Sequence, residues 1–152
     1  MAKILVLSDT HGKTDRIKKL QPLFNECDCV FHLGDYYSDM NEFREQLGNK
    51  LYAVKGNCDF GGQPLFVEAF GVKIMAVHGN KYGVKNSLSL LLATALEEKC
   101  DLVLYGHTHL EKVETFSGLT VVNPGAVSGF FGGTYAVVEI EDKKINAFIQ
   151  NV

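Results

Sequence analysis

The sequence of 152 residues predicts an α/β fold in which two sheets pack together and helices cover their outer faces. In the first part of the chain, short apolar and β-branched runs alternate with helical patterns, as in βα units. In the remainder, pairs of such runs are separated by short turn sequences, as in hairpins. The length and the 46% hydrophobic content suit a single domain that spans residues 1–152.

The first part of the chain is expected to form three strands and two helices. The segment Lys3–Ser8 is almost continuously apolar, which is typical of a strand buried on both faces. A helical pattern follows at Thr14–Gln21, and Pro22 is expected to kink or restart that helix. The next elements are a strand at Cys29–Leu33, a helix at Ser38–Leu47 with a good N-cap, and a strand at Leu51–Lys55.

The second part contains one more helix, one buried strand and three hairpins. Asn86 is expected to cap an amphipathic helix, and Asp101–Tyr105 is expected to be a buried strand. The apolar face of that helix carries Leu88, Leu91, Leu92, Ala95 and Leu96. The predicted hairpins are Leu65–Phe70 with Val72–Val77, Lys112–Phe116 with Leu119–Val122, and Thr134–Ile140 with Lys143–Ile149, and the last of these turns at Glu141-Asp142.

The composition argues against several classes of protein. The formal net charge is −3, whereas a protein dedicated to duplex DNA usually has a basic face, so strong nucleic-acid binding is not expected. No apolar run approaches the roughly 20 residues that span a bilayer, and the N-terminal apolar run is too short for a signal peptide. We therefore expect a cytoplasmic protein whose four cysteines stay reduced.

Polar side chains that can bind metal ions follow five of the predicted strands. In order along the chain they are Asp9 and His11, Asp35, Asn57, His78, and finally His107 and His109, each next to or near a glycine. Ligands bind outside the carboxyl ends of the strands in sheets of this kind, so these side chains are expected to meet at one edge. In an extended backbone, His107 and His109 would point to the same side.

Imidazole, carboxylate and amide oxygen together suit divalent ions such as manganese, iron, zinc or nickel. Seven ligands exceed the needs of one tetrahedral zinc but suit two ions, roughly 3.5–4 Å apart, that share a carboxylate and a water. Two such ions carry four positive charges, and Asp9, Asp35 and a hydroxide remove three of them. About one positive charge then remains to receive a phosphate ester. Taken singly, each motif also fits a turn residue, a helix cap or a core histidine.

Together, the ordered motifs resemble the signature of the calcineurin-like metallophosphoesterases. They are Asp9-x-His11, Gly34-Asp35, Gly56-Asn57, His78-Gly79 and Gly106-His107-x-His109, and the resemblance extends from Lys3 to about Ile140. Cys58, where the wider family has histidine, and Asn123-Pro124-Gly125 resemble the family's small prokaryotic phosphodiesterase branch. The resemblance implies a four-layer α/β/β/α sandwich of two mixed sheets flanked by helices.

The resemblance also implies a site and an activity. Asp9, His11 and His109 would bind the first ion; Asn57, His78 and His107 would bind the second; and Asp35 would bridge the two. The ions would be Mn²⁺, with Ni²⁺, Zn²⁺ and Fe²⁺ as alternatives. The implied reaction is hydrolysis of a small, nucleotide-like phosphodiester by a hydroxide that bridges the ions. Asp35, Asn57 and His107 are the residues expected to take part in catalysis.

Two departures from the family pattern affect the expected chemistry. The family's histidine at the position of Cys58 is thought to protonate the leaving group. A thiol with a pKa of about 8.5 is a poorer general acid than a protonated imidazole. Cys58 is therefore interpreted first as a small buried thiol without a catalytic role, and water or Asp59 could supply the proton. After Asn123-Pro124-Gly125, relatives often continue with Ser and a nearby Arg, whereas this chain continues with Ala126 and lacks the Arg. Phe130 and Phe131, which lie between glycines, could form an apolar rim for a base or an aryl group, or a core or dimer contact.

Two other interpretations compete with the phosphodiesterase. One is a non-catalytic or weakly catalytic metal-binding scaffold of the same fold, and the other is a phosphomonoesterase or nuclease. A homo-oligomer is compatible with either. His32 lies inside a predicted strand, and a supporting role in the core is expected for it rather than metal binding.

Overall fold

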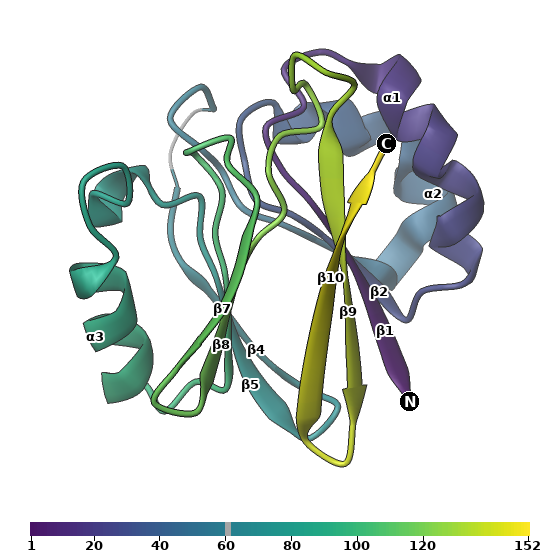
Figure 1. Cartoon of the computed structure of the whole chain (residues 1–152). Coiled ribbons are helices and arrows are strands. Elements are labelled where there is room, and N and C mark those ends of the chain that lie inside the picture. Colours follow the sequence, from purple (N-terminus) through teal and green to yellow (C-terminus); the bar gives the residue numbers. More distant parts are fainter. Residues whose placement is uncertain (60–61) are drawn as a thin grey trace.

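The computed structural model describes residues 1–59 and 62–152 and consists of two five-stranded sheets that pack face to face. Figure 1 shows helices α1 (Thr14–Leu20) and α2 (Arg44–Leu47) on the outside of one sheet. Helix α3 (Ser89–Glu97) lies on the outside of the other. The layers therefore follow the order α/β/β/α, which confirms the predicted four-layer sandwich.

The first sheet has the strand order β10-β9-β1-β2-β3. Strands β1, β2 and β3 run parallel, whereas β9 is antiparallel to β1 and β10 is antiparallel to β9, so the sheet is mixed. The bounds are β1 Ala2–Leu7, β2 Cys29–His32, β3 Leu51–Ala53, β9 Thr134–Glu141 and β10 Lys144–Asn151.

The second sheet is also mixed and has the order β4-β5-β6-β8-β7. Strands β5, β6 and β8 are parallel, and β4 and β7 close the two edges as antiparallel strands. The bounds are β4 Leu65–Ala69, β5 Val72–Ala76, β6 Leu102–Leu104, β7 Lys112–Phe116 and β8 Leu119–Asn123.

A continuous hydrophobic core lies between the two sheets. Ile4 and Phe31 from the first sheet and Ile74 and Leu104 from the second belong to this cluster and are fully buried. Burial of such side chains stabilises the fold by roughly 1.5–3 kcal/mol each. The core holds the central strands of the two sheets together, and the loops that follow these strands start from buried residues.

The predicted helix at Ser38–Leu47 is wrong in its first part. Residues Tyr37–Phe43 form a 3₁₀-helix, and only Arg44–Leu47 is α-helical. The buried side chains of the 3₁₀ segment are Met40 and Phe43, which are three residues apart and therefore lie on one face of a helix with three residues per turn. The other 3₁₀-helices are Gln21–Asn25, Gly48–Lys50 and Asn80–Tyr82. Helix α1 ends at Leu20, and Pro22 lies in the first turn of the 3₁₀-helix Gln21–Asn25. The predicted restart at this proline is therefore confirmed.

Helix α3 begins later than predicted. Asn86 does not cap it, because its backbone N–H donates to the Gly83 carbonyl in a turn and the N-cap position is Leu88, which provides no side-chain cap. The Ser87 hydroxyl accepts the N–H of Ser89 at 3.1 Å just before the helix. Leu91 and Ala95 are fully buried as predicted, but Leu96 is exposed because the helix contacts the sheet along a narrower stripe.

The last hairpin turns one residue later than predicted. Asp142 and Lys143 have φ values of 50° and 65°, which fit the left-handed pair of a two-residue hairpin turn. Strand β9 consequently extends to Glu141, which pairs with Lys144. The other two predicted hairpins form with the expected pairing.

Candidate metal centre

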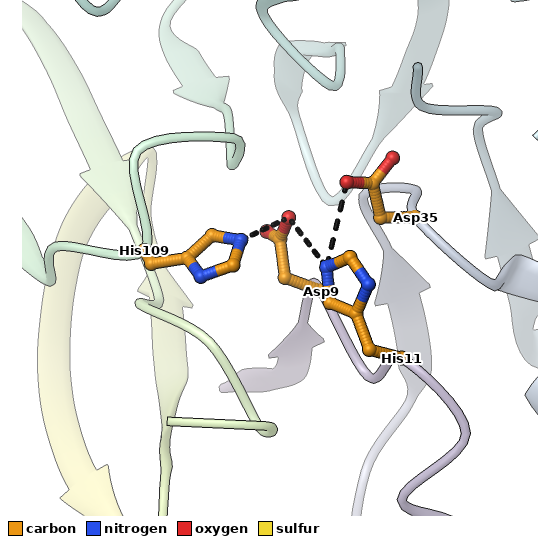
Figure 2. A group of neighbouring side chains, drawn as sticks. All are labelled: Asp9, His11, Asp35 and His109. Atoms are coloured by element: carbon orange, nitrogen blue, oxygen red, sulfur yellow. Dashed lines mark ion pairs between the residues drawn. The ribbon is translucent and has the colours of Figure 1, made fainter. Parts of the chain in front are cut away.

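Loops from both sheets bring six of the seven candidate ligands into two groups of His and Asp side chains. The first group is Asp9, His11, Asp35 and His109, and the second is Asp35, His78 and His107. Within each group the ligand atoms lie within 4.8 Å of one another, and Asp35 belongs to both. Figure 2 shows the four side chains of the first group pointing toward one another from three loops, because Asp9 and His11 share the loop after β1.

Among the residues that the structure describes, two buried polar atoms of the first group have no hydrogen-bond partner, Asp9 Oδ1 and His11 Nε2. The other carboxylate oxygen of Asp9 accepts the Ser8 hydroxyl at 2.5 Å and the His107 N–H at 3.2 Å. Oδ1 instead faces His109 Nε2 at 3.1 Å and His11 Nε2 at 3.8 Å. Buried polar atoms are rarely left without a partner, and a carboxylate oxygen between two imidazole nitrogens is a set that a divalent ion would satisfy.

The imidazole of His78 lies at the centre of the second group. Its Nδ1–H donates to the Leu33 carbonyl at 2.8 Å, which leaves Nε2 with a free lone pair in the neutral ring. Nε2 lies 2.9 Å from Asn57 Oδ1, 3.1 Å from His107 Nδ1 and 3.4 Å from Asp35 Oδ1. Asn57, the seventh candidate ligand, is therefore also in place. Electron-rich atoms that converge in this way suit a cation at their centre.

Asp35 lies between the two groups and faces each with a different oxygen. Oδ2 is 3.5 Å from His11 Nε2, and Oδ1 is 3.4 Å from His78 Nε2 and accepts the Cys58 N–H at 2.9 Å. Burial alone would raise the pKa of this carboxyl, but the Cys58 N–H and the nearby His78 outweigh that effect and lower it. Asp35 is consequently ionised at neutral pH.

His107 is held in the form that a metal ligand requires. Burial lowers its pKa, and the nearby His78 and Lys85 lower it further. The ring is therefore neutral at neutral pH and keeps a lone pair on one nitrogen.

Five of the seven candidate ligands have backbone in the left-handed region. The φ values are 54° at Asp9, 43° at His11, 57° at Asp35, 70° at His107 and 62° at His109. For residues other than glycine this conformation costs on the order of 1 kcal/mol or more, and it concentrates at functional sites. The assumption of extended backbone at His107 and His109 is therefore wrong. A sharp turn, rather than the alternation of a strand, directs each side chain inward.

Two glycines allow the loops to approach this closely. A Cβ on Gly56 would collide with Asp35 Oδ1, and a Cβ on Gly106 would collide with Ser8 Oγ and lie 2.8 Å from Asp9 Oδ2. Only glycine leaves room for the carboxylates at these two positions.

The family model of the calcineurin-like phosphoesterase superfamily domain matches residues 2–143. The chain belongs to this superfamily. The resemblance carried by the strand-end motifs is thereby confirmed.

Several prokaryotic members of the superfamily are similar over most of the chain. A probable metallophosphoesterase of Mycoplasma pneumoniae is 36% identical over 131 residues, which are 84% of this chain and 80% of that protein. A phosphodiesterase of Methanocaldococcus jannaschii is 29% identical over 97% of this chain and 98% of its own length. A crystal structure of a conserved phosphoesterase-like protein from Streptococcus pneumoniae has a TM-score of 0.83 at 30% identity, over 99% of this chain and 91% of that one.

The fold also occurs in a protein named for a different process. Vacuolar protein sorting 29 from Cryptosporidium parvum has a TM-score of 0.78 at 18% identity, over 99% of this chain and 97% of that one. At this identity the likeness shows the fold alone. Within residues 1–59 and 62–152, every helix is too short or too polar to cross a membrane.

His32 is completely buried and stabilises the loops that carry the candidate ligands. Its Nδ1 accepts the Gly34 N–H at 3.2 Å, so Nε2–H donates to the Thr10 hydroxyl at 3.0 Å, which in turn donates to the Tyr36 carbonyl at 3.2 Å. Burial, followed by the proximity of His78, lowers the pKa of His32 to about 3. The neutral ring therefore ties the loop of Asp9 and His11 to the loop of Asp35.

The position of Cys58 differs from the expectation of a buried thiol. Cys58 is exposed, and its Sγ lies 3.6 Å from Asn57 Nδ2. Desolvation and the adjacent carboxylate of Asp35 raise its pKa, so the thiol is protonated at neutral pH. Asp59 stabilises the turns around it, because its carboxylate accepts the N–H groups of Tyr36 and Gly56 at 2.8 Å each.

The core role considered for Phe130 and Phe131 is wrong, because the two residues are 93% and 97% exposed. Their rings form an edge-to-face pair with centroids 5.2 Å apart. The alternatives of an apolar rim and a dimer contact stay predictions.

Two supporting residues were not found by reasoning from the sequence. Ser8 binds Asp9 as described, and the buried Asn123 donates to the Gly106 carbonyl at 3.1 Å and to the Thr108 hydroxyl at 3.0 Å. Thr108 thus turns away from the cluster, and Asn123 fixes the loop that carries His107 and His109. The only sequence signal for this role was an Asn-Pro-Gly turn directly after a strand.

The buried neutral His32 leads to a prediction about pH. We expect His32→Asn in chelator-treated protein to lower the free energy of unfolding at pH 7.5 by about 1–3 kcal/mol, because the bond to Thr10 is lost. His32 has a pKa near 6.5 in the unfolded chain and about 3 when folded. Below pH 6.5 the unfolded wild type alone takes up this proton, so the wild type loses up to about 1.4 kcal/mol per pH unit from this group.

The difference between wild type and variant should therefore narrow as the pH falls from 6.5 to 5. Urea unfolding at several pH values measures it. A difference that stays constant over this range would show that His32 is not a buried neutral group.

Proposed function

We propose that this chain is a metal-dependent phosphodiesterase that binds two divalent ions and hydrolyses small, nucleotide-like phosphodiesters in the cytoplasm as a single domain. The observation that carries the proposal is the membership of Asp35 in both ligand groups, with one oxygen toward each. A carboxylate in this position is what a pair of neighbouring ions requires as a bridge.

The ligands divide between the ions according to their contacts. Asp9, His11 and His109 would hold the first ion, and the partnerless Asp9 Oδ1 and His11 Nε2 support this set. Asn57, His78 and His107 would hold the second, supported by the lone pairs that converge around His78 Nε2. Manganese is the commonest activating ion of the superfamily and is our first choice.

When bound, the ions supply Lewis acidity, which provides a shared hydroxide as nucleophile and offsets charge on the phosphate oxygens. The chain's own residues keep this centre in a reactive state. Asp35 stays ionised because the Cys58 N–H and His78 lower its pKa, and His107 stays neutral because burial lowers its pKa. Asn57 is exposed beside the cluster, so its NH₂ group could donate to a phosphate oxygen.

The distribution of arginine favours a diester over a monoester. The sequence has two arginines, Arg16 and Arg44. Arg16 donates to the Val127 and Gly129 carbonyls at 2.8 and 2.7 Å, and Arg44 donates to Asn41 at 2.8 Å. Neither is free to bind the second negative charge of a monoester bidentately, as arginine commonly does. A diester, with a single negative charge, matches the approximately single positive charge of the loaded centre.

A scaffold role is the second candidate, because the fold is shared with vacuolar protein sorting 29. The exposed pair Phe130 and Phe131 would be a natural contact for a protein partner or a second copy. A complete set of candidate ligands favours the enzyme.

The proposal predicts activity that depends on metal. Purified protein reconstituted with Mn²⁺ should hydrolyse methyl p-nitrophenyl phosphate, and exhaustive chelation should abolish at least about 99% of the rate. The measurement is release of p-nitrophenol before chelation, after chelation and after readdition of Mn²⁺, Ni²⁺, Zn²⁺ or Mg²⁺. Full activity after confirmed metal loss, or no activity with any ion, would contradict the proposal, and the second result would favour the scaffold.

Cys58 provides a separate prediction about the leaving group. Because its protonated thiol is a weak acid, Cys58→Ala should keep kcat for an aryl diester within about threefold. Cys58→His should increase the rate for an alkyl leaving group, which needs a proton more, by about 10-fold to 100-fold. Steady-state kinetics on both esters test this. A folded, metal-loaded and inactive Cys58→Ala would show that the thiol itself is needed.

A further inference from the structure

The phenol ring of Tyr36 lies at the edge of the candidate metal centre. Its centroid is 5.1 Å from that of the His11 imidazole, and the two planes are tilted by 50°. The side chain is 44% exposed. The ring thus touches a candidate ligand at an angle and leaves much of its surface open to solvent.

The backbone of Tyr36 is held firmly in an unfavourable conformation. Its φ of 67° is left-handed, which a bulky residue adopts only when the surroundings impose it. Its N–H donates to Asp59 Oδ1 at 2.8 Å, and its carbonyl accepts the Thr10 hydroxyl at 3.2 Å and the Asp39 N–H at 2.9 Å. The backbone that carries the ring is therefore held in place on both sides.

These bonds also locate the ring relative to the candidate ligands. Thr10 belongs to the loop of His11, and Asp59 belongs to the loop of Asn57. Tyr36 is consequently anchored between one loop from each ligand set. The ring lies beside His11 of the first ligand group, where an ester substituent of a bound phosphate diester could contact it.

We propose that Tyr36 is a specificity-determining residue that stacks on a flat aromatic group of the substrate, either a nucleobase or an aryl ester. The inference rests on the proposed function and deepens it by naming the substrate class. An aromatic side chain can stack on any nucleobase, because every base has a π-face. Tyr36 would bind the substituent, and the phosphate would remain at the metal centre.

The test compares two phosphate monoesters that differ at C1 of the sugar, which carries a base in one and a hydroxyl in the other. Thymidine 5′-phosphate and 2-deoxyribose 5-phosphate are titrated by calorimetry into Mn²⁺-loaded protein. We expect the wild type to bind the nucleotide about 10-fold to 100-fold more tightly than the sugar phosphate. Tyr36→Asn removes the ring while tolerating the left-handed backbone, and it should bring this ratio to within about threefold of one. Tyr36→Phe should keep the ratio.

Phe116→Ala is the matched control, because Phe116 is 49% exposed and lies on β7 beside the Ser117-Gly118 turn, outside the candidate metal centre. Metal content and circular dichroism establish that each variant is loaded and folded. The rate for methyl p-nitrophenyl phosphate then shows whether the aromatic group that stacks on Tyr36 is a nucleobase or an aryl ester. If Tyr36→Asn lowers the rate for this aryl ester and not the nucleotide ratio, the stacked group is the aryl ester.

If Tyr36→Asn changes neither quantity, the inference is overturned. Failure of the proposed function gives a different pattern. In that case the loaded wild type does not hydrolyse the aryl ester, whereas the binding ratio of the two phosphates still tests Tyr36.

Discussion

The carboxylate of Asp35 stands between two clusters of imidazole groups, and much of the local structure serves to hold it there. Its two oxygens face His11 and His78 at 3.5 and 3.4 Å, while the Cys58 N–H fixes its orientation. Burying such a charge without compensation is costly. Around it, Asp9 Oδ1 and His11 Nε2 have no hydrogen-bond partner. The proposed ions would satisfy these groups together, so the centre is best understood as a cation site whose protein part is already assembled.

The sandwich explains how so many polar groups can be brought together. A rigid core between the sheets fixes the strand ends, and left-handed turns at Asp9, Asp35 and His107 then direct side chains into one space. Buried hydrogen bonds from His32 and Asn123 hold two of these turns. His32 can accept the Gly34 N–H only in its neutral form, and its burial keeps the ring neutral.

The sequence was most informative about the segments that follow a strand, because the carboxyl ends of parallel strands meet at one edge of a sheet. It did not predict the left-handed turns that direct the side chains inward. The ordered motifs located every candidate ligand, and the apolar runs located both sheets. Patterns said less about loops. The three-residue spacing of Met40 and Phe43 fits both an α-helix and the observed 3₁₀-helix Tyr37–Phe43, so it does not distinguish them. The exposure of Cys58 and the bracing by Asn123 depend on which loops meet, and this is decided by tertiary packing rather than by local propensity.

The most direct test of the shared carboxylate is the Mn²⁺ stoichiometry and affinity of wild type and Asp35→Asn by calorimetry and elemental analysis. Asp28→Asn serves as a control, since Asp28 accepts the Lys3 N–H at the amino ends of β1 and β2, whereas the candidate ligands follow the carboxyl ends. We expect about two ions for the wild type and the control, and loss of both sites together in Asp35→Asn, because the neutral amide cannot bridge. An Asp35→Asn protein that keeps one or both ions at wild-type affinity would contradict the bridging role.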